Sequence, residues 1–245
     1  MATFLTQGQE VKIHSHNDYQ RRFPFYEAYG QFLSSLESDI FTTDVKGELL
    51  VAHNASDLST APTLDEAYLQ PILSLFKLND GRPWRKSDKI LYWLIDLKTD
   101  ANPTLDYLVD KLRPYPEVFD TLVNPYSVRV IISGSVPKAE RFGDYPSFIT
   151  FDGSRLDYTP KQLERISMIS FNLRNYSNWN GKEPMLDEDY QKLSEIVKAV
   201  HALGKPIRFW GTPDGERAWS TFHALGIDVI NTDTPAACAE YFRKK

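Results

Sequence analysis

Side chains that can move protons or bind cations follow four short apolar runs early in the chain. They are His14, His16 and Asn17 around the first run, Glu37 and Asp39 at the second, His53 after the third, and Asp96 and Lys98 at the fourth. Such placing is typical of a site assembled from several strand ends, because the carboxyl edge of a parallel barrel collects the residues that end each strand. The spacing therefore indicates one composite site.

The carboxylates Glu37 and Asp39 carry the first chemical signal. Residues i and i+2 of a strand point to the same side, about 6.6 Å apart along the chain. Two carboxylates in a poorly solvated place repel each other unless a cation neutralises them. Asn17 and Asp96 would complete a set of oxygen ligands that suits Ca²⁺ or Mg²⁺. Taken alone, Glu-x-Asp fits carboxylates that are solvated or paired with Arg and Lys even better, so the neighbouring residues carry the metal hypothesis.

The histidines allow two kinds of site. His14 and His16 have the i, i+2 spacing with which many zinc hydrolase barrels begin, but those sites need further imidazole or thiolate ligands. The chain has five histidines, and His201 and His223 fall in helical stretches, so only His53 remains. Considered alone, His53 is better explained as a structural residue that closes a hairpin. Histidines beside an oxygen-ligated metal serve better as a general acid and base near neutral pH.

Lys98 follows Asp96 by two residues and would share its side of the strand. It fits either a salt bridge within the rim or a cation for a phosphate group. Later strand ends offer four further candidates: Ser133, Asp152, Asn172 and Trp210. For Asp152 and Asn172 we favour loop or capping roles. The polar and aromatic segment 175–184 fits either a loop that covers substrate or an ordinary surface loop.

The bulk properties predict one soluble globular domain over residues 1–245. The length of 245 residues suits a single barrel, which commonly takes about 250 residues. The apolar fraction of 42% and the charged fraction of 25% are ordinary for a globular protein. The net charge of −5, with acids and bases interspersed, shows no electrostatic footprint for nucleic acid.

The sequence shows no membrane or export signal. No run approaches the roughly 18 apolar residues of a membrane span. Residues 1–10 lack a basic start and an apolar core, so no signal peptide is visible. The compartment stays open, and one possibility is an exported protein whose signal peptide has been removed. The oligomeric state stays open too. The single cysteine, Cys238, excludes an internal disulfide framework.

Short β-rich runs alternate with helical stretches along the whole chain. The predicted strands are residues 11–16, 36–41, 91–97, 128–133, 148–151, 168–173, 207–210 and 228–231. Several are continuously apolar, as expected for parallel strands that are covered on both faces. A further run, 48–52, follows the second strand after only residues 42–47. This gap is too short for a helical crossover and predicts the returning arm of a hairpin.

Helix signals fill the gaps between the strands. Thr63–Glu66 and Thr159–Gln162 have the form of capping boxes. Residues 187–204 open on a candidate N-cap, Asp187, and stop at Gly204. Eight strand–helix units predict an α/β fold, a single TIM-type (β/α)8 barrel with a hairpin after its second strand. The alternative, a doubly wound open sheet, is weakened because no Gly-x-Gly-x-x-Gly follows the first strand.

These residues resemble the phospholipase C-like phosphodiesterase superfamily. Residues 15–19, Ser-His-Asn-Asp-Tyr, resemble the Ser-His-Asn-x-Tyr that opens the catalytic barrel of phosphoinositide-specific phospholipase C. Residues 37–39, the hairpin and residues 51–54 resemble the Glu-x-Asp-Val and Val-x-His-Asp block of glycerophosphodiester phosphodiesterases. Residues 95–98 are similar to that family's acidic-x-Lys strand, which usually has Glu where this chain has Asp96.

The end of the chain extends the resemblance. Phe209-Trp210 and residues 226–235 are similar to the closing Trp strand and the Gly-Val-Asp and Thr-Asp-x-Pro segment of that family. The opening His-Ser-His-Asn-Asp-Tyr, with Pro24-Phe25 and residues 27–29, resembles most a subgroup named for altered inheritance of mitochondria. The His-Arg-Gly opening of the glycerophosphodiesterases is missing here, which puts their substrate in question for this chain.

The resemblance implies a role for each part of the site. His16 and His53 would be an acid–base pair. The metal ligands would be Asn17, Glu37, Asp39 and Asp96. Lys98, His14 and Trp210 are expected on the substrate side, with His14 orienting a ligand from behind. The Ca²⁺ or Mg²⁺ would bind a phosphate oxygen, while one histidine deprotonates the attacking hydroxyl or water and the other protonates the leaving alkoxide.

The sequence therefore favours a metal-dependent phosphodiesterase that acts on a glycerophosphodiester or a phosphoinositide-type head group. One alternative is a zinc-dependent, amidohydrolase-like or phosphoesterase barrel that uses His14-x-His16. The other is a non-catalytic barrel that binds a phosphorylated ligand. Tightly held zinc would indicate the first alternative, and a folded protein without turnover would indicate the second.

Overall fold

Parallel strands close into a barrel in the computed structural model, which describes residues 11–43, 45 and 47–245. Within these residues the ring contains eight parallel strands: β1 (Lys12–Ser15), β2 (Ser35–Thr42), β4 (Tyr92–Leu97), β5 (Arg129–Gly134), β6 (Ile149–Gly153), β7 (Ile166–Asn172), β8 (Ile207–Trp210) and β9 (Val229–Thr232). The ring is closed because β1 pairs in parallel with both β2 and β9. The predicted barrel is confirmed, and closure excludes an open sheet.

The predicted hairpin is confirmed as well. Strand β3 (Leu49–Val51) runs antiparallel to β2 on the outside of the ring, with Ile40 opposite Val51. Two residues of the connecting turn, 44 and 46, and the segment 1–10, for which no signal peptide was predicted, lie outside the described residues. By returning the chain along β2, the hairpin brings the residues that follow β3 back to the carboxyl edge of the barrel.

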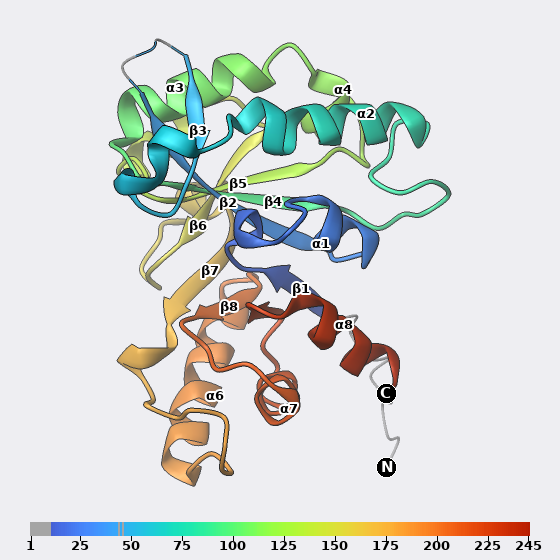
Figure 1. The fold of residues 1–245 in the computed structure, drawn as a ribbon. Helices are drawn as coiled ribbons and strands as arrows, with labels where there is room; N and C mark the ends of the chain where they lie inside the picture. Colours follow the sequence, from blue (N-terminus) through green and yellow to red (C-terminus); the bar gives the residue numbers. More distant parts are fainter. Residues whose placement is uncertain (1–10, 44, 46) are drawn as a thin grey trace.

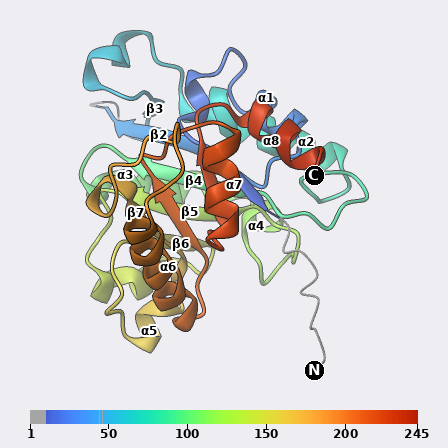
Figure 2. The same ribbon diagram turned by 90° about the horizontal axis from the view of Figure 1, so that it is seen from below.

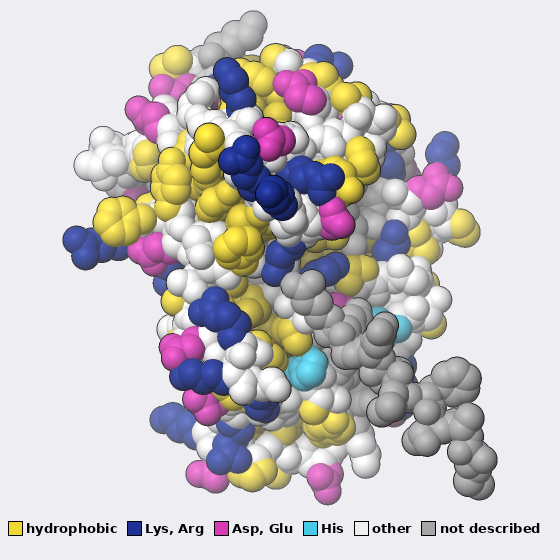
Figure 3. Space-filling model, turned by 90° about the vertical axis from the view of Figure 1, so that its right-hand side faces the viewer, with side chains coloured by type: hydrophobic (Ala, Val, Ile, Leu, Met, Phe, Trp, Pro, Cys, Tyr) yellow, Lys and Arg dark blue, Asp and Glu magenta, His cyan; other side chains and the backbone are white. Residues whose placement is uncertain are grey.

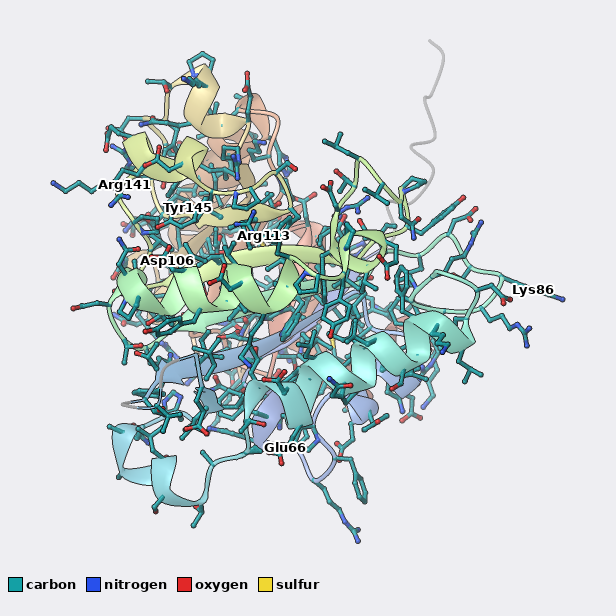
Figure 4. The ribbon with its side chains drawn as sticks, turned by 90° about the horizontal axis from the view of Figure 1, so that it is seen from above. Glu66, Lys86, Asp106, Arg113, Arg141 and Tyr145 are labelled. Atoms are coloured by element: carbon teal, nitrogen blue, oxygen red, sulfur yellow. The ribbon has the colours of Figure 1, made fainter. Side chains whose placement is uncertain are left out.

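Helices surround the barrel. They are α1 (Tyr26–Gly30), α2 (Gln70–Leu78), α3 (Ala101–Leu112), α4 (Pro116–Phe119), α5 (Pro160–Leu163), α6 (Asp187–Ala202), α7 (Glu216–Ala224) and α8 (Pro235–Arg243). Figure 1 shows α2 and α3 on one side of the strands and α6 and α7 on the other. Figure 2, turned to view from below, shows α6 and α7 in front of the strands. Figure 4 shows α2 and α3 lying side by side across the strands.

Local capping signals set several of these boundaries. In both predicted capping boxes the residues bond reciprocally: Glu66 N–H donates to Thr63 Oγ1 at 3.2 Å, and Thr159 N–H donates to Gln162 Oε1 at 2.9 Å. The predicted N-cap Asp187 is wrong, because Leu186 is the N-cap and has no side-chain cap bond. Asp187 instead lies in an acidic first turn, where a carboxylate complements the helix dipole. Gly204 ends this segment with φ of 68°.

Alternation along the strands decides what lies inside the barrel. Successive strand residues point to opposite faces, and the outward ones join the main core beneath the helices. The inward ones form a separate, small apolar cluster: Leu94, Ile131, Met168 and Val229. Two residues further along their strands stand polar residues: Asp96, Ser133, Ser170 and Asn231. An apolar floor therefore supports a polar layer at the carboxyl end of the barrel.

The charged side chains are as mixed on the surface as they are along the sequence. Figure 3 shows acidic, basic and apolar side chains interspersed over the face that it presents. Among the helices of the described residues, none is both long and apolar enough to cross a membrane.

Candidate active site

The polar layer opens into a cavity of about 410 Å³ at the carboxyl end of the strands. Its lining comprises His16, Asn17, Glu37, His53, Asp96, Lys98, Ser133, Gly134, Val136, Asp152, Gly153, Ser154, Ser170, Arg208 and Trp210. Nine residues have a predicted catalytic, metal-binding or substrate-side role; seven of them are in this lining, and the other two, Asp39 and His14, are not. The barrel thus gathers residues that are far apart in sequence into one place.

His16 is held by a carboxylate from the other end of the chain. Its Nδ1 lies 2.7 Å from Asp233 Oδ1, and because a carboxylate accepts, Nδ1–H donates and Nε2 is left for substrate. Asp214 fixes the loop, since its Oδ2 accepts from the Asp233 N–H at 2.9 Å. Burial opposes a charge on His16, but Asp233 and Glu37 outweigh it, so the pKa of His16 is raised.

His53 follows the hairpin and shares a carboxylate with Tyr19. The Tyr19 hydroxyl donates to Asp39 Oδ2 at 2.7 Å, and His53 Nδ1 lies 3.2 Å from that oxygen and 3.0 Å from the hydroxyl. Nδ1–H therefore donates to Asp39, and Nε2 is the unprotonated nitrogen when the ring is neutral. Asn17 completes the cluster: its Oδ1 lies 3.1 Å from Tyr19 Oη, and its φ of 47° is one that asparagine adopts more readily than most residues.

Lys98 bridges two of the predicted metal ligands. Its Nζ lies 2.9 Å from Asp39 Oδ2 and 2.8 Å from Asp96 Oδ1. Ser133 donates to Asp96 Oδ2 at 2.9 Å. Burial disfavours the ammonium, but the two carboxylates prevail and the pKa of Lys98 is raised. The salt-bridge interpretation of Lys98 is therefore confirmed, and the same residue also lines the cavity.

His14 and Glu37 meet beneath the cavity. His14 is fully buried, with Nδ1 2.7 Å from Ser35 Oγ and Nε2 2.8 Å from Glu37 Oε2. Burial and the nearby Arg208 lower the pKa of His14 to about 4, so its ring is neutral at pH 7. Because both ring nitrogens are engaged, His14 is not placed to share a zinc ion with His16. His14 does not line the cavity, and it contacts Glu37, one of the predicted metal ligands, from behind.

Arg208 ties these groups to a further carboxylate. Its Nη1 lies 2.9 Å from His14 Nε2 and 3.4 Å from Glu37 Oε2, and its Nη2 lies 3.2 Å from Asp152 Oδ2. Only 5% of its side chain is exposed. The loop or capping role favoured for Asp152 is wrong, because Asp152 lies within β6 and faces the cavity. Burial raises the pKa of Asp152 to about 6, although Arg208 opposes the shift.

The donor set bears on the predicted metal. Four carboxylates, those of Glu37, Asp39, Asp96 and Asp152, lie beside two permanent cations, Lys98 and Arg208, which leaves a formal charge of −2 on these six side chains. Asp39 Oδ1 is buried and has no hydrogen-bond partner. By donor type and charge the set therefore fits a divalent cation with oxygen ligands. Its arrangement differs from a preformed metal cage, since across the described residues no three His, Cys, Asp or Glu side chains are gathered to hold an ion.

Sequence reasoning missed several members of the site. Arg208 could have been found from the sequence, because it is the charged residue of the otherwise apolar run 207–210. A charged side chain in a buried strand is seldom without a partner, so Arg208 indicates a buried ion pair. Asp233 stood within the closing motif, but no role could be assigned to it. Asn172 does cap a short turn, since its Oδ1 accepts from the Arg174 N–H at 2.9 Å. No residue of the segment 175–184 lines the cavity, and its Trp179 packs against Phe222.

Asp233→Asn should move the pH dependence of activity. The neutral amide no longer stabilises the imidazolium, so the pKa of His16 falls and the limb of the pH–rate profile that reports His16 moves to lower pH. We expect kcat to fall by at least about tenfold, with the roughly 10⁴-fold loss caused by the comparable change in a serine protease triad as the upper bound. NMR titration of the imidazole and a pH–rate profile measure both effects. An unmoved profile, with exposed Asp144→Asn as the control, would contradict this role.

Gly134→Ala should destabilise the rim beside Asp96. Gly134 has φ of 73°, and an added Cβ would lie 2.6 Å from both Asp96 Oδ1 and the Leu97 carbonyl oxygen. We expect a loss of more than about 1 kcal/mol in the free energy of unfolding, measured by urea denaturation. Gly143→Ala is the matched control, because a Cβ there meets nothing within 4 Å. Equal stabilities of the two variants would refute the expectation.

Comparison with known proteins finds a matching domain family and similar curated proteins. The model of the AIM6-like phosphodiesterase domain matches residues 2–137. Altered inheritance of mitochondria protein 6 from Eremothecium gossypii is 27% identical over 94% of this chain and 69% of its own length. Its homolog from Arthroderma benhamiae is 25% identical over 98% of this chain and 87% of its own length.

Solved structures extend the likeness to the whole fold. A glycerophosphodiester phosphodiesterase from Parabacteroides distasonis has a TM-score of 0.60 at 15% identity, covering 96% of this chain and 98% of its own. Another from Agrobacterium tumefaciens has a TM-score of 0.56 at 15% identity, covering 95% and 99%. These identities show a shared fold. The family model spans more than half of the chain, including His16, His53 and the carboxylates Glu37, Asp39 and Asp96, and the chain therefore belongs to the AIM6-like phosphodiesterase domain family.

Proposed function

We propose that the protein is a metal-dependent phosphodiesterase that cleaves a glycerophosphodiester or a phosphoinositide-type phosphodiester. One observation carries the proposal. His16 and His53 both line a single cavity, each is anchored through Nδ1 to a carboxylate, and Lys98 lines the same cavity. Two imidazoles with free Nε2 atoms and cations beside them suit proton transfer to and from a phosphodiester.

The two histidines are assigned different roles by their partners. Asp233 favours the protonated form of His16, so His16 is the acid that gives a proton to the leaving alkoxide. His53 is the base, and its Nε2 takes the proton of the attacking hydroxyl or water while Asp39 accepts from its Nδ1–H. Tyr19 holds the Asp39 carboxylate in place by donating to the same oxygen. After the transfer each histidine has the protonation state of the other, and exchange of a proton with water resets the pair.

The metal stays a proposal with named ligands. Asn17, Glu37, Asp39 and Asp96 would hold Ca²⁺ or Mg²⁺, the donors being three carboxylates and an amide oxygen. When bound, the cation would offset the negative charge of the phosphate oxygens. His14 and Arg208 orient Glu37 from below. Lys98 pairs with Asp39 and Asp96, so a metal ion on these two carboxylates would take the place of its ammonium group. The free ammonium of Lys98 could then pair with the phosphate.

The family name supports the reaction class, and the names of the structural neighbours support a glycerophosphodiester as the first substrate to try. The zinc alternative is disfavoured because both nitrogens of His14 have partners. The non-catalytic alternative is disfavoured because both histidines and all four proposed metal ligands lie in or directly beside one cavity.

Hydrolysis after metal removal tests the proposal. We would treat the protein with EDTA and measure turnover of bis(p-nitrophenyl) phosphate, glycerophosphodiesters and phosphoinositides, then add back Ca²⁺, Mg²⁺ or Zn²⁺. We expect EDTA to abolish turnover, Ca²⁺ or Mg²⁺ to restore it, and His16→Ala to stay inactive. Restoration by zinc alone would favour the His14-x-His16 hydrolase. No turnover with any metal, in protein shown to be folded, would overturn the proposed function.

A further inference from the structure

Four large apolar side chains are exposed at the amino end of the barrel, opposite the catalytic rim. In a (β/α)8 barrel, the loops that lead from a helix into the next strand lie at this end. Phe32 lies between α1 and β2, and Leu78 ends α2 before β4. Leu122 and Val123 lie between α4 and β5. The exposed fraction of the four side chains ranges from 54% for Phe32 to 82% for Leu122.

The three loops that carry these side chains lie together. Their strands β2, β4 and β5 are consecutive in the ring. The Asn124 side-chain amide donates to the Gly81 carbonyl oxygen at 2.8 Å, which joins the turn after α4 to the turn after α2. The ring of Phe32 stacks on Trp84, with 5.6 Å between the centroids, which joins the turn after α1 to the same segment. The amino-end surface is defined as Phe32, the segment 77–89, Leu122 and Val123.

The amino-end surface is also basic. Its segment 77–89 carries five Lys or Arg residues and two Asp residues, an excess of three positive charges in a chain whose net charge is −5. Residues 113–129, which contain the turn after α4, carry two charges of each sign and leave this excess unchanged. Lys86 points away from the body of the molecule (Figure 4), and Lys and Arg side chains lie beside apolar ones on the face that Figure 3 presents.

An anionic lipid bilayer is complementary to exposed apolar side chains surrounded by cations. Its negative head groups attract Lys and Arg, and short apolar side chains can enter the boundary between head groups and acyl chains. Leu122 and Val123 suit this insertion because they lie in a tight turn, in which the Leu122 N–H donates to Asp120 Oδ1 at 2.9 Å. The described helices include none that could cross a membrane, so attachment through this surface is peripheral.

We propose that the amino-end surface docks the protein onto a bilayer that contains anionic lipid. The catalytic cavity lies at the other end of the barrel, so it faces away from the bilayer in the docked protein. The consequence for the substrate rests on the proposed function. A docked protein receives its phosphodiester from the aqueous phase, because a diester embedded in the same bilayer lies out of reach of His16 and His53. Docking therefore favours a water-soluble glycerophosphodiester over a membrane phosphoinositide.

Co-sedimentation with lipid vesicles tests the docking. We would mix the full chain with phosphatidylcholine vesicles, with and without phosphatidylserine, at low and at high salt. We expect at least tenfold tighter binding when phosphatidylserine is present, and weaker binding at high salt because salt screens exposed charges. Leu122→Ser combined with Val123→Ser should lower the affinity at least tenfold. Lys86→Gln should lower it about fivefold, the effect of one cation near such a surface.

Two substitutions at the opposite end of the barrel are the matched controls. Leu186→Ser changes a leucine that is 71% exposed, and Lys182→Gln changes an exposed lysine. Both residues lie between β7 and α6, on the side of the catalytic rim. Neither substitution should change vesicle binding. All of the variants should keep the wild-type melting temperature, because the side chains that they change are exposed.

Several results would overturn the docking. They are no binding to either kind of vesicle, equal binding to both kinds, and an equal loss of binding in the two controls. A dimer that Leu122→Ser with Val123→Ser dissociates, seen by sedimentation without vesicles, would instead assign the amino-end surface to a second copy of the chain.

Turnover separates the docking from the proposed function. Vesicle binding without hydrolysis of any diester would refute the proposed function and leave the docking standing. Hydrolysis of a soluble glycerophosphodiester without vesicle binding would do the reverse. We expect vesicle-bound protein to hydrolyse the soluble glycerophosphodiester faster than a phosphoinositide in the same vesicles. The opposite order would refute the orientation of the docked protein.

Discussion

His16→Ala and His53→Ala are each expected to lower kcat by about 10²–10⁴-fold, the usual contribution of one general acid or base. The reason is that each variant removes the nitrogen that carries one of the two protons in the reaction. Neither residue belongs to the hydrophobic core, so the melting temperature should change little. Turnover of the best diester substrate with saturating metal measures the effect. The double variant should lose little more than the poorer single one, because residues that act as a unit are not additive.

His201→Ala is the matched control for both histidines. His201 is exposed on α6, pairs with Asp228 at 2.8 Å and does not line the cavity. It should keep wild-type kcat within a factor of about two, as a surface substitution away from the site. If His16→Ala and His53→Ala fold and turn over like His201→Ala, the acid–base assignment is wrong.

Arg208→Met is expected to have the largest effect on stability. The change leaves the carboxylates of Glu37 and Asp152 buried without their cation, and breaking a buried ion pair in this way costs about 3–5 kcal/mol. For a chain of this length we expect the melting temperature to fall by roughly 6–20 °C. Differential scanning calorimetry measures it. Arg208 lowers the pKa of Asp152, so in the variant that pKa rises above the wild-type value of about 6. Acid therefore protonates the stranded carboxylate, and part of the lost stability should return as the pH falls toward 6.

Two controls separate the charge of Arg208 from its shape. Arg141→Met removes an exposed arginine of the same size, labelled in Figure 4, and should change the free energy of unfolding by no more than about 0.5 kcal/mol. In the wild type, Arg208 Nε also donates to Ser170 Oγ at 3.0 Å. Arg208→Lys keeps the charge but cannot bond to His14, Ser170 and Asp152 at once, so its stability should lie between those of Arg208→Met and the wild type. A melting temperature for Arg208→Met equal to that of Arg141→Met would show that the contacts of Arg208 with Glu37, Asp152 and His14 do not stabilise the fold.

The sequence by itself determined the strands and the residues at their ends. Continuous apolar runs bounded by turn signals predicted every strand of the ring to within a few residues, because strands covered on both faces need apolar residues throughout. The hairpin followed from a connection too short for a crossover. Since the residues that end parallel strands share one edge, the nine residues with predicted roles were expected at one site, and seven of them line the cavity.

Only the tertiary structure decided how these groups pair. His16 and Asp233 are 217 residues apart, and Arg208 is 171 residues from Glu37, so no local pattern relates them. Their contacts exist because β1 pairs with β9 and closes the ring, which brings both ends of the chain to one rim. The alternation of β6 turns Asp152 inward, and the pairing of β1 with β2 places His14 behind Glu37. Strand periodicity is a local property of the backbone and can be read from sequence, whereas the partner of a buried charge depends on which distant strands become neighbours.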